Sequence, residues 1–209
     1  ERADEGLRAL LLRACRQFWP AEIAALAAFF ALMMTRTLSQ LAGASLFSRA
    51  EAVAVLCLPL AAMLHMGLRI ARERKESLLS MLGVCVLCGA AMLARVSFIE
   101  RSSGDYDIYL ADWMAKLAAG SFGEGMKANI GEYNVLYQYI LFIITRLNVP
   151  ALYAVKAVSF IGDAFLAGAA ARLARREGKD SLAAFGVVLL LPTVVLNGGM
   201  YAQCDSLYA

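Results

Sequence analysis

Two carboxylates, Asp105 and Asp107, stand two residues apart directly after a Ser-Gly pair. Carboxylates this close can share a divalent cation, or repel one another until one accepts a proton near neutral pH. The spacing excludes an EF-hand, because the sixth and twelfth positions counted from Asp105 are Leu110 and Lys116 rather than Gly and Glu. The pair is therefore either part of a reactive site that could hold a divalent cation, or a solvated acidic turn.

Lys156 and Asp163 lie seven residues apart within one apolar run, so a helix would present both on one face. Ionisable groups inside a membrane span are costly and tend to mark a functional path. At about 10 Å apart along the axis they are too distant to pair, so each needs another partner, such as a phosphate for the lysine. The alternative is that Lys156 snorkels to the nearer interface while Asp163 bonds to a neighbouring helix.

The third polar group ends the last long apolar run, where Asn197, Tyr201, Gln203 and Asp205 follow or flank two glycines that are expected to interrupt the helix. Irregular backbone at membrane depth is tolerated where it lines a cavity. The stretch is therefore either cavity lining or a span end that leads into a loop.

These groups belong to an unusually apolar chain of 209 residues, which is 61% hydrophobic and 18% charged, with a mean hydropathy of +0.63. Soluble domains contain about 45–50% apolar and about 25% charged residues. Residues 77–94 and 181–204 hold no charge, which is long enough for membrane spans. The net charge of +3 is mild, and the basic residues gather at the ends of apolar runs. We therefore expect membrane lipid as a partner and no nucleic acid.

The apolar runs predict an all-α fold, a polytopic bundle of transmembrane helices with an external loop bearing amphipathic helices. In that loop Ile108, Trp113 and Leu117 recur at near-helical spacing. The expected parts are an amphipathic surface helix at 1–17, three transmembrane helices in 18–97, an external loop at 98–134, and a short or re-entrant helix plus two transmembrane helices in 135–209. The expected spans are 18–37, 51–67, 77–96, 150–171 and 181–197, with the apolar segment 133–147 as the short helix.

Two basic clusters predict the topology. One follows the second span and contains Arg69, Arg72, Arg74 and Lys75, and the other lies around Arg172 to Lys179. The positive-inside rule assigns both clusters to the cytoplasm, so the external loop and residues 197–205 are expected to converge on the opposite side. The chain starts at Glu1 and stops inside an apolar run, as a fragment of a longer polypeptide would.

Four motifs follow one another between about residues 92 and 209. They are Ser-Gly-Asp105-Tyr-x-x-x-Leu110-x-x-Trp113, Gly131-Glu-Tyr133-Asn134-x-x-Tyr137-x-Tyr139, Lys156-x-x-Ser159-x-x-x-Asp163, and Pro192-x-x-x-x-Asn197-x-x-x-Tyr201-x-Gln203-x-Asp205. Together they resemble the GT-C membrane glycosyltransferases, in particular bacterial proteins related to GPI mannosyltransferase II and, more distantly, the dolichyl-phosphate-glucose glucosyltransferases. The chain departs from that pattern at Val135 and Leu136, where a proline is usual, and at Tyr201-Ala202, where Trp-Gly is usual.

The resemblance implies an enzyme that moves a hexose of mannose or glucose type, with inversion, from a polyprenyl-phosphate donor to a lipid- or glycan-linked hydroxyl. It implies a bacterial cytoplasmic membrane, with the active site on the extracytoplasmic side. Asp105 matches the acid of the first external loop, the general base. Substrate-binding residues are then expected at Asp107, Trp113, Tyr133, Asn134, Lys156, Asp163, Gln203 and Asp205.

Four further cations are candidates to stabilise the leaving phosphate: Arg95, Arg101, Lys127 and Arg146. A competing function is a polytopic transporter or flippase for a lipid-linked or small anionic substrate, which the intramembrane Lys156 and Asp163 and the interrupted last run would suit. A structural subunit of a membrane complex is a third function, and it would tolerate the loss of Asp105.

Overall fold

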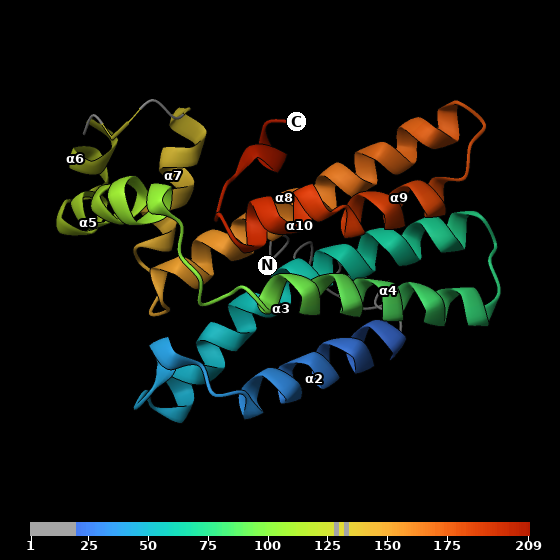
Figure 1. Cartoon of the computed structure of the whole chain (residues 1–209), viewed down its shortest axis with the longest axis horizontal. Helices are drawn as coiled ribbons and strands as arrows, with labels where there is room; N and C mark the ends of the chain where they lie inside the picture. The colour runs from blue at the N-terminus through green and yellow to red at the C-terminus, as the bar shows by residue number, and fades with distance from the viewer. Residues whose placement is uncertain (1–19, 128–129, 132–133) are drawn as a thin grey trace, which may run out of the picture.

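The computed structural model describes residues 20–127, 130–131 and 134–209. The surface helix expected at 1–17 lies outside these residues, as does Tyr133. Within them all regular secondary structure is helical (Figure 1). The α-helices are α2 (Pro20–Thr35), α3 (Leu46–Glu73), α4 (Leu78–Val96), α5 (Ala111–Ala119), α6 (Phe122–Lys127), α7 (Val135–Ile144), α8 (Ala151–Arg176), α9 (Ser181–Leu190) and α10 (Pro192–Gly199); shorter turns are η1 (Ser39–Leu41), η2 (Tyr106–Leu110) and η3 (Asp205–Leu207).

Three helices, α3, α4 and α8, are long and apolar enough to cross a membrane. They contain the spans expected at 51–67, 77–96 and 150–171, which are confirmed as helices. Ser45 and Ser77 cap the first turns of α3 and α4 by accepting hydrogen bonds from Ser48 and Ser80 N–H, because the first N–H groups of a helix have no partner within it. The chain is thus an all-α protein with several candidate membrane spans.

Two apolar helices are shorter than a span. α2 has 16 residues, or about 24 Å at 1.5 Å per residue, against a hydrocarbon core of about 30 Å. It covers residues 20–35 of the span expected at 18–37. α7 has 10 residues, which agrees with the expectation that the segment 133–147 is too short for a straight crossing.

The last apolar run, expected as a single span at 181–197, is a bent pair. α9 and α10 meet at an angle of 48°, at Leu191 and Pro192. Proline lacks an N–H and forces the preceding residue out of the helical region, and Leu191 accordingly has φ −58° and ψ 121°. The glycines after Asn197 were expected to interrupt the helix, and α10 ends at the second of them, Gly199.

The bundle packs around α8, which contacts α3 on one side and α9 on the other. A small residue allows α3, α4 and α9 to approach one another closely. A Cβ at Gly67 of α3 would lie 2.7 Å from Val84 Cγ1 and 3.0 Å from Phe185 Cε1, so three helices meet where only a glycine fits.

Ion pairs join the basic ends of the helices. Arg72 pairs with Glu22 at the start of α2 at 3.1 Å, and Arg74 pairs with Asp180 before α9 at 2.5 Å. The α3–α4 and α8–α9 turns therefore lie at the same end of the bundle, on the right in Figure 1. Both basic clusters share one end, as their charge predicted, and the loop after α4 lies at the other.

The loop after α4 leads into a helix at 104–119, in which residues 106–110 form a π-helical turn. The expected helix is confirmed, but its faces differ from those that the spacing suggested. Leu117 is buried whereas Ile108 is 66% exposed, because a π turn adds a residue and rotates what precedes it. Helices α5, α6 and α7 gather at this end of the bundle (Figure 1).

Candidate functional site

The loop between α4 and the π turn is held against the C-terminal segment of the chain. Ser103 Oγ accepts a hydrogen bond from Tyr106 N–H at 3.2 Å, as a cap does. The same hydroxyl donates to the Tyr201 carbonyl at 2.8 Å. One serine thus fixes the start of the helix that contains Asp105 and ties it to a residue 98 positions later.

Asp105 itself binds Gln203, whose Nε2 donates to Asp105 Oδ2 at 2.9 Å. A carboxylate can only accept, so the amide nitrogen must face it. Ala202 directs Gln203 there through a left-handed backbone with φ +56°, a conformation that is uncommon for residues with a side chain. The convergence of the two segments, expected from charge placement, is confirmed.

A cavity of about 270 Å³ opens beside this hydrogen bond. Its lining residues come from both segments: Ser102, Ser103, Gly104, Asp105, Met200 and Tyr201. Asp105 is exposed, and Gln203 is its hydrogen-bond partner in the described part of the chain. The Oδ1 atom of Asp105 is thus available to take a proton from a hydroxyl. The adjoining π turn is a feature that recurs at functional sites.

Asp107 has a separate partner, since Ser102 Oγ donates to its Oδ2 at 2.9 Å. Helix residues two apart do not face one another, so Asp105 and Asp107 point in different directions. Among the described residues no group of three or more His, Cys, Asp and Glu side chains is arranged to hold a metal ion. A cation at Asp105 would need further ligands from a substrate and from water.

Asp205 lies at the start of η3, where Asn197 Nδ2 donates to its Oδ2 at 3.3 Å. The next residue, Ser206, donates to Asp163 at 2.5 Å. The C-terminal segment therefore contacts Asp105 through Gln203 and, three residues later, contacts Asp163 in the interior of α8 through Ser206.

Asp163 is fully buried and pairs with Arg95 of α4, whose Nε lies 2.9 Å from Asp163 Oδ2. Arg95 Nη1 also donates to the Ala91 and Leu189 carbonyls, and its Nη2 has no hydrogen-bond partner among the described residues. A bond from Asp163 to a neighbouring helix was the alternative reading of that residue, and it is confirmed. Arg95 is accordingly placed in the core rather than beside Asp105.

Lys156 is also fully buried. Its Nζ donates to the carbonyls of Phe98 at 2.6 Å, Ile99 at 3.3 Å, and Arg101. The last carbonyls of a helix lack internal partners, and Lys156 satisfies those that follow α4. Lys156 thus has the separate partners that it was predicted to need, and they are protein carbonyls. The alternative, in which it snorkels to the interface, was wrong.

Two further predicted site residues have structural contacts in the loop region. Trp113 of α5 lies beside Tyr109, with ring centroids 6.1 Å apart, and over Gly131. Asn134 caps α7, accepting from Leu136 N–H at 3.0 Å. The described contacts of these two residues do not reach Asp105. Tyr133 lies outside the described residues.

The remaining cations that were predicted to bind phosphate differ in their surroundings. Arg146 donates to the Leu117 and Gly120 carbonyls at the end of α5 and lies 4.5 Å from the Phe142 ring centroid. Arg101 and Lys127 are exposed. Of the four candidates, Arg101 is the nearest to Asp105 along the chain.

Glu100 was not among the site residues predicted from the sequence. It links the end of α4 to η1 and to the start of α8. It accepts from Ser39 N–H, from Ser39 Oγ at 2.7 Å, and from Tyr153 OH at 3.1 Å. Partial burial opposes its charge, but the bonds from Ser39 and Tyr153 outweigh that effect and lower the pKa of Glu100. Its place directly after a predicted span was the only signal in the sequence.

Comparison of the chain with protein-family models, with curated proteins and with solved structures finds no match.

Proposed function

We propose that this protein is a membrane glycosyltransferase of GT-C type, which transfers a hexose from a polyprenyl-phosphate donor to a lipid- or glycan-linked hydroxyl. The observation that supports this most is the hydrogen bond between Gln203 and Asp105. It joins two of the motifs on which the resemblance rests, although 98 residues separate them. An accidental likeness of short motifs would not require them to meet.

The proposed chemistry is a single displacement. Asp105 Oδ1 takes the proton from the acceptor hydroxyl, whose oxygen forms a bond to the anomeric carbon. The bond from that carbon to the phosphate oxygen breaks, and the lipid phosphate leaves with the electron pair, so the configuration inverts. A general base contributes about 10²–10⁴-fold, and Gln203 holds the carboxylate in place. Arg101 is the candidate that stabilises the leaving phosphate.

The orientation of the bundle suits a lipid-linked donor. Asp105 lies at the end opposite to the basic ends of α3 and α8, so the positive-inside rule would put it on the extracytoplasmic side. A polyprenyl chain would lie in the bilayer beside the helices, with its phosphate at the interface near the cavity. The bacterial cytoplasmic membrane and the synthesis of cell-envelope glycan belong to this proposal.

The test is transfer of radiolabelled mannose or glucose from polyprenyl-phosphate donors by the full-length protein. Asp105→Asn is expected to reduce the rate by about 10²–10⁴-fold, since the amide cannot take the proton. Asp112→Asn is the matched control, because Asp112 lies on the same helix and pairs with Lys116 at the surface. It is expected to keep the activity within about twofold. Assays with and without Mg²⁺ and chelator measure dependence on a divalent cation.

Equal rates for the wild type and Asp105→Asn would contradict the role of Asp105 as general base. No transfer from any polyprenyl donor by an otherwise folded protein would remove the transferase itself.

A transporter or flippase for a lipid-linked or small anionic substrate is the second candidate. The observation that favours it is the 48° break between α9 and α10, since transporters build substrate sites at broken helices. It predicts that proteoliposomes move a labelled lipid-linked sugar across the bilayer without cleaving the sugar from its phosphate. Release of the lipid phosphate in the same vesicles would favour the transferase.

A further inference from the structure

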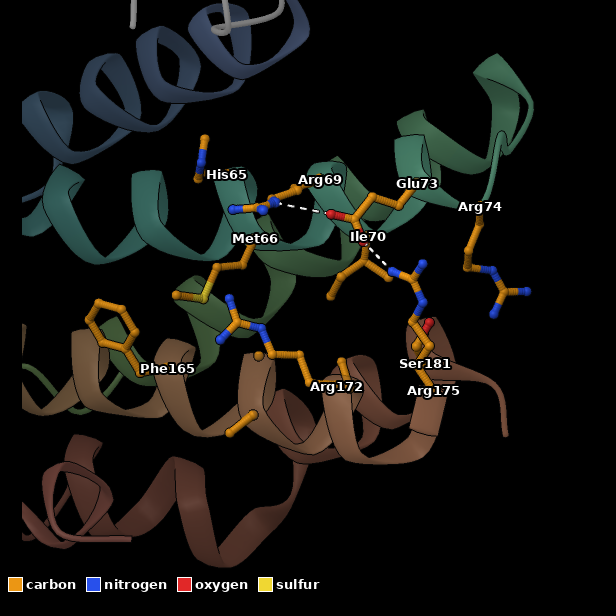
Figure 2. Close-up of a pocket in the computed structure, with 13 residues that line it drawn as sticks. His65, Met66, Arg69, Ile70, Glu73, Arg74, Phe165, Arg172, Arg175 and Ser181 are labelled. Atoms are coloured by element: carbon orange, nitrogen blue, oxygen red, sulfur yellow. Dashed lines mark hydrogen bonds and ion pairs between the residues drawn. The ribbon is translucent and has the colours of Figure 1, made fainter. Parts of the chain in front are cut away.

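A second cavity lies between α3 and α8, towards the ends of these helices where the basic residues gather (Figure 2). Its volume is about 510 Å³, within the range of about 300–1,000 Å³ that small-molecule sites occupy. It is formed by the last turns of the two helices and has no role in the proposed transfer reaction. An inference about it is therefore independent of that proposal.

The charge of this cavity is unbalanced. Its lining contains four arginines and one glutamate: Arg69, Arg74, Arg172, Arg175 and Glu73. Arg69 and Arg175 share Glu73, with Arg69 Nε at 3.1 Å from its Oε1 and Arg175 bonded to its Oε2. Arg74 is engaged with Glu76 and Asp180.

Arg172 makes no hydrogen bond or ion pair with any residue that the structure describes. Figure 2 shows it reaching from α8 towards α3, beside Met66. The three guanidinium groups of Arg69, Arg172 and Arg175 are thus accompanied by one carboxylate, that of Glu73, which leaves an excess of positive charge. Guanidinium groups match the oxygens of phosphate closely, so an anion with several oxygens would use the donors that remain.

The polarity of the lining changes along the helices. Phe165 lies seven residues before Arg172 on α8, or about 10 Å deeper in the bundle, and is 57% exposed. Ala169 of α8 and Met66 of α3 belong to the same apolar part, whereas the arginines form the rim. The Arg69 and Arg175 side chains are 62% and 64% exposed. The groove is thus apolar at membrane depth and cationic at the surface.

We propose that this groove is a binding site for an anionic phospholipid. The lipid phosphate would bind Arg69, Arg172 and Arg175, and the start of an acyl chain would lie on Phe165 and Ala169. Basic pockets between helices at the cytoplasmic surface suit such headgroups. A free phosphate would use the rim alone and leave the exposed apolar wall without a purpose, which is why we assign the site to a lipid.

The experiment is lipid binding to the full chain in detergent, measured by native mass spectrometry. Dioleoyl phosphatidylglycerol and dioleoyl phosphatidylcholine have the same acyl chains and differ in net charge. Phosphatidylglycerol is expected to be retained at least about fivefold better. Arg172→Gln should lower this retention about fivefold, and the pair Arg172→Gln and Arg175→Gln should lower it to the level of phosphatidylcholine.

Arg176→Gln is the matched control. Arg176 is exposed at the same end of α8 but does not line the cavity, so its substitution removes the same charge without touching the site. It is expected to bind phosphatidylglycerol as the wild type does. An equal loss in Arg176→Gln and Arg172→Gln would reduce the effect to general surface charge and overturn the site.

Two further outcomes would overturn the proposal. Equal retention of the two lipids by the wild type would show that the groove does not select an anion. Displacement of phosphatidylglycerol by millimolar inorganic phosphate would assign the arginines to a soluble phosphate compound instead. Because Arg172 makes no described bond within the protein, its variant is expected to elute and fold as the wild type, and Arg172→Lys should retain part of the binding.

Discussion

At the scale of single residues, the candidate site depends on one carboxylate and the amide that holds it. Gln203 binds one oxygen of Asp105, and the other is the oxygen to which the proposed mechanism assigns the substrate proton. Neither residue type is unusual by itself, and an exposed aspartate is ordinarily only a surface charge. Its cavity and its partner from the far end of the chain distinguish Asp105 from the other exposed acids of the loop.

Gln203→Met should therefore affect turnover more than substrate binding. A hydrogen bond to a charged group contributes about 1.5–3 kcal/mol, so we expect kcat for sugar transfer to fall about 10-fold or more while KM changes little. The matched control is Gln40→Met, since Gln40 is exposed on η1 and outside the cavity. A rise in KM at unchanged kcat would show that Gln203 binds substrate rather than positioning the base.

Glu100 provides a second prediction at this scale, on stability. Its pKa lies below its ordinary value of 4.5 in the folded protein. The contribution to stability is therefore complete above about pH 4.5 and is lost as the pH falls through the lower, folded value. Glu100→Gln is expected to lower Tm by about 1–3 °C at pH 7. This difference should shrink below pH 4.5.

Thermal unfolding in detergent between pH 3 and 7 measures this difference. Glu177→Gln is the control, because Glu177 is exposed at the end of α8 and far along the chain from Glu100 and its partners. A constant difference between wild type and Glu100→Gln across the pH range would mean that the charge of Glu100 contributes nothing.

At the scale of elements, the region between α4 and α7 depends on a close contact between a glycine and an indole ring. Gly131 has φ +68°, and a Cβ there would lie 2.1 Å from Trp113 Cζ2. Both the left-handed backbone and the missing side chain are therefore required. This contact holds the segment before α7 against α5, on which Trp113 lies.

Gly131→Ala should push the Trp113 ring away from this contact. The left-handed backbone alone costs about 1–2 kcal/mol for a residue with a side chain, and the clash adds to it. Trp19 is the only other tryptophan, so a Trp19→Phe background isolates the emission of Trp113, which should shift to the red. Gly123→Ala is the control, since a Cβ at Gly123 meets nothing within 4 Å. An unchanged spectrum in Gly131→Ala would contradict the packing.

At the scale of the whole molecule, one buried ion pair links most of the bundle. Arg95 of α4 binds Asp163 of α8 and the Leu189 carbonyl of α9, and Asp163 also binds Ser206. Four segments thus meet at one charged cluster inside the protein. A buried charge without its partner is strongly unfavourable, so the cluster specifies how these segments pack.

Removal of either partner should therefore destabilise the fold far more than removal of both. Arg95→Met and Asp163→Leu are each expected to cost about 3–5 kcal/mol, while the double variant should regain most of this loss. Thermal stability of the detergent-purified protein checks the three variants. A double variant that is less stable than either single one would show that the pair stabilises the bundle beyond mutual neutralisation.

The sequence alone determined where the long helices lie and which of their ends share a side. Both properties are local, since a span needs a run of apolar residues as long as the hydrocarbon core, and basic residues mark its cytoplasmic end. The contact between residues 197–205 and the loop after α4 followed from the placement of the two basic clusters.

Only the tertiary structure decided which side chains meet. Lys156 was predicted to need a partner such as a phosphate, with the interface as the alternative, and it binds the carbonyls after α4 instead. Asp163 binds Arg95, and Asp105 binds Gln203. These partners are 58, 68 and 98 residues apart. No periodicity reaches over such separations, because the pairings depend on how far each helix slides and turns against its neighbours when the core closes.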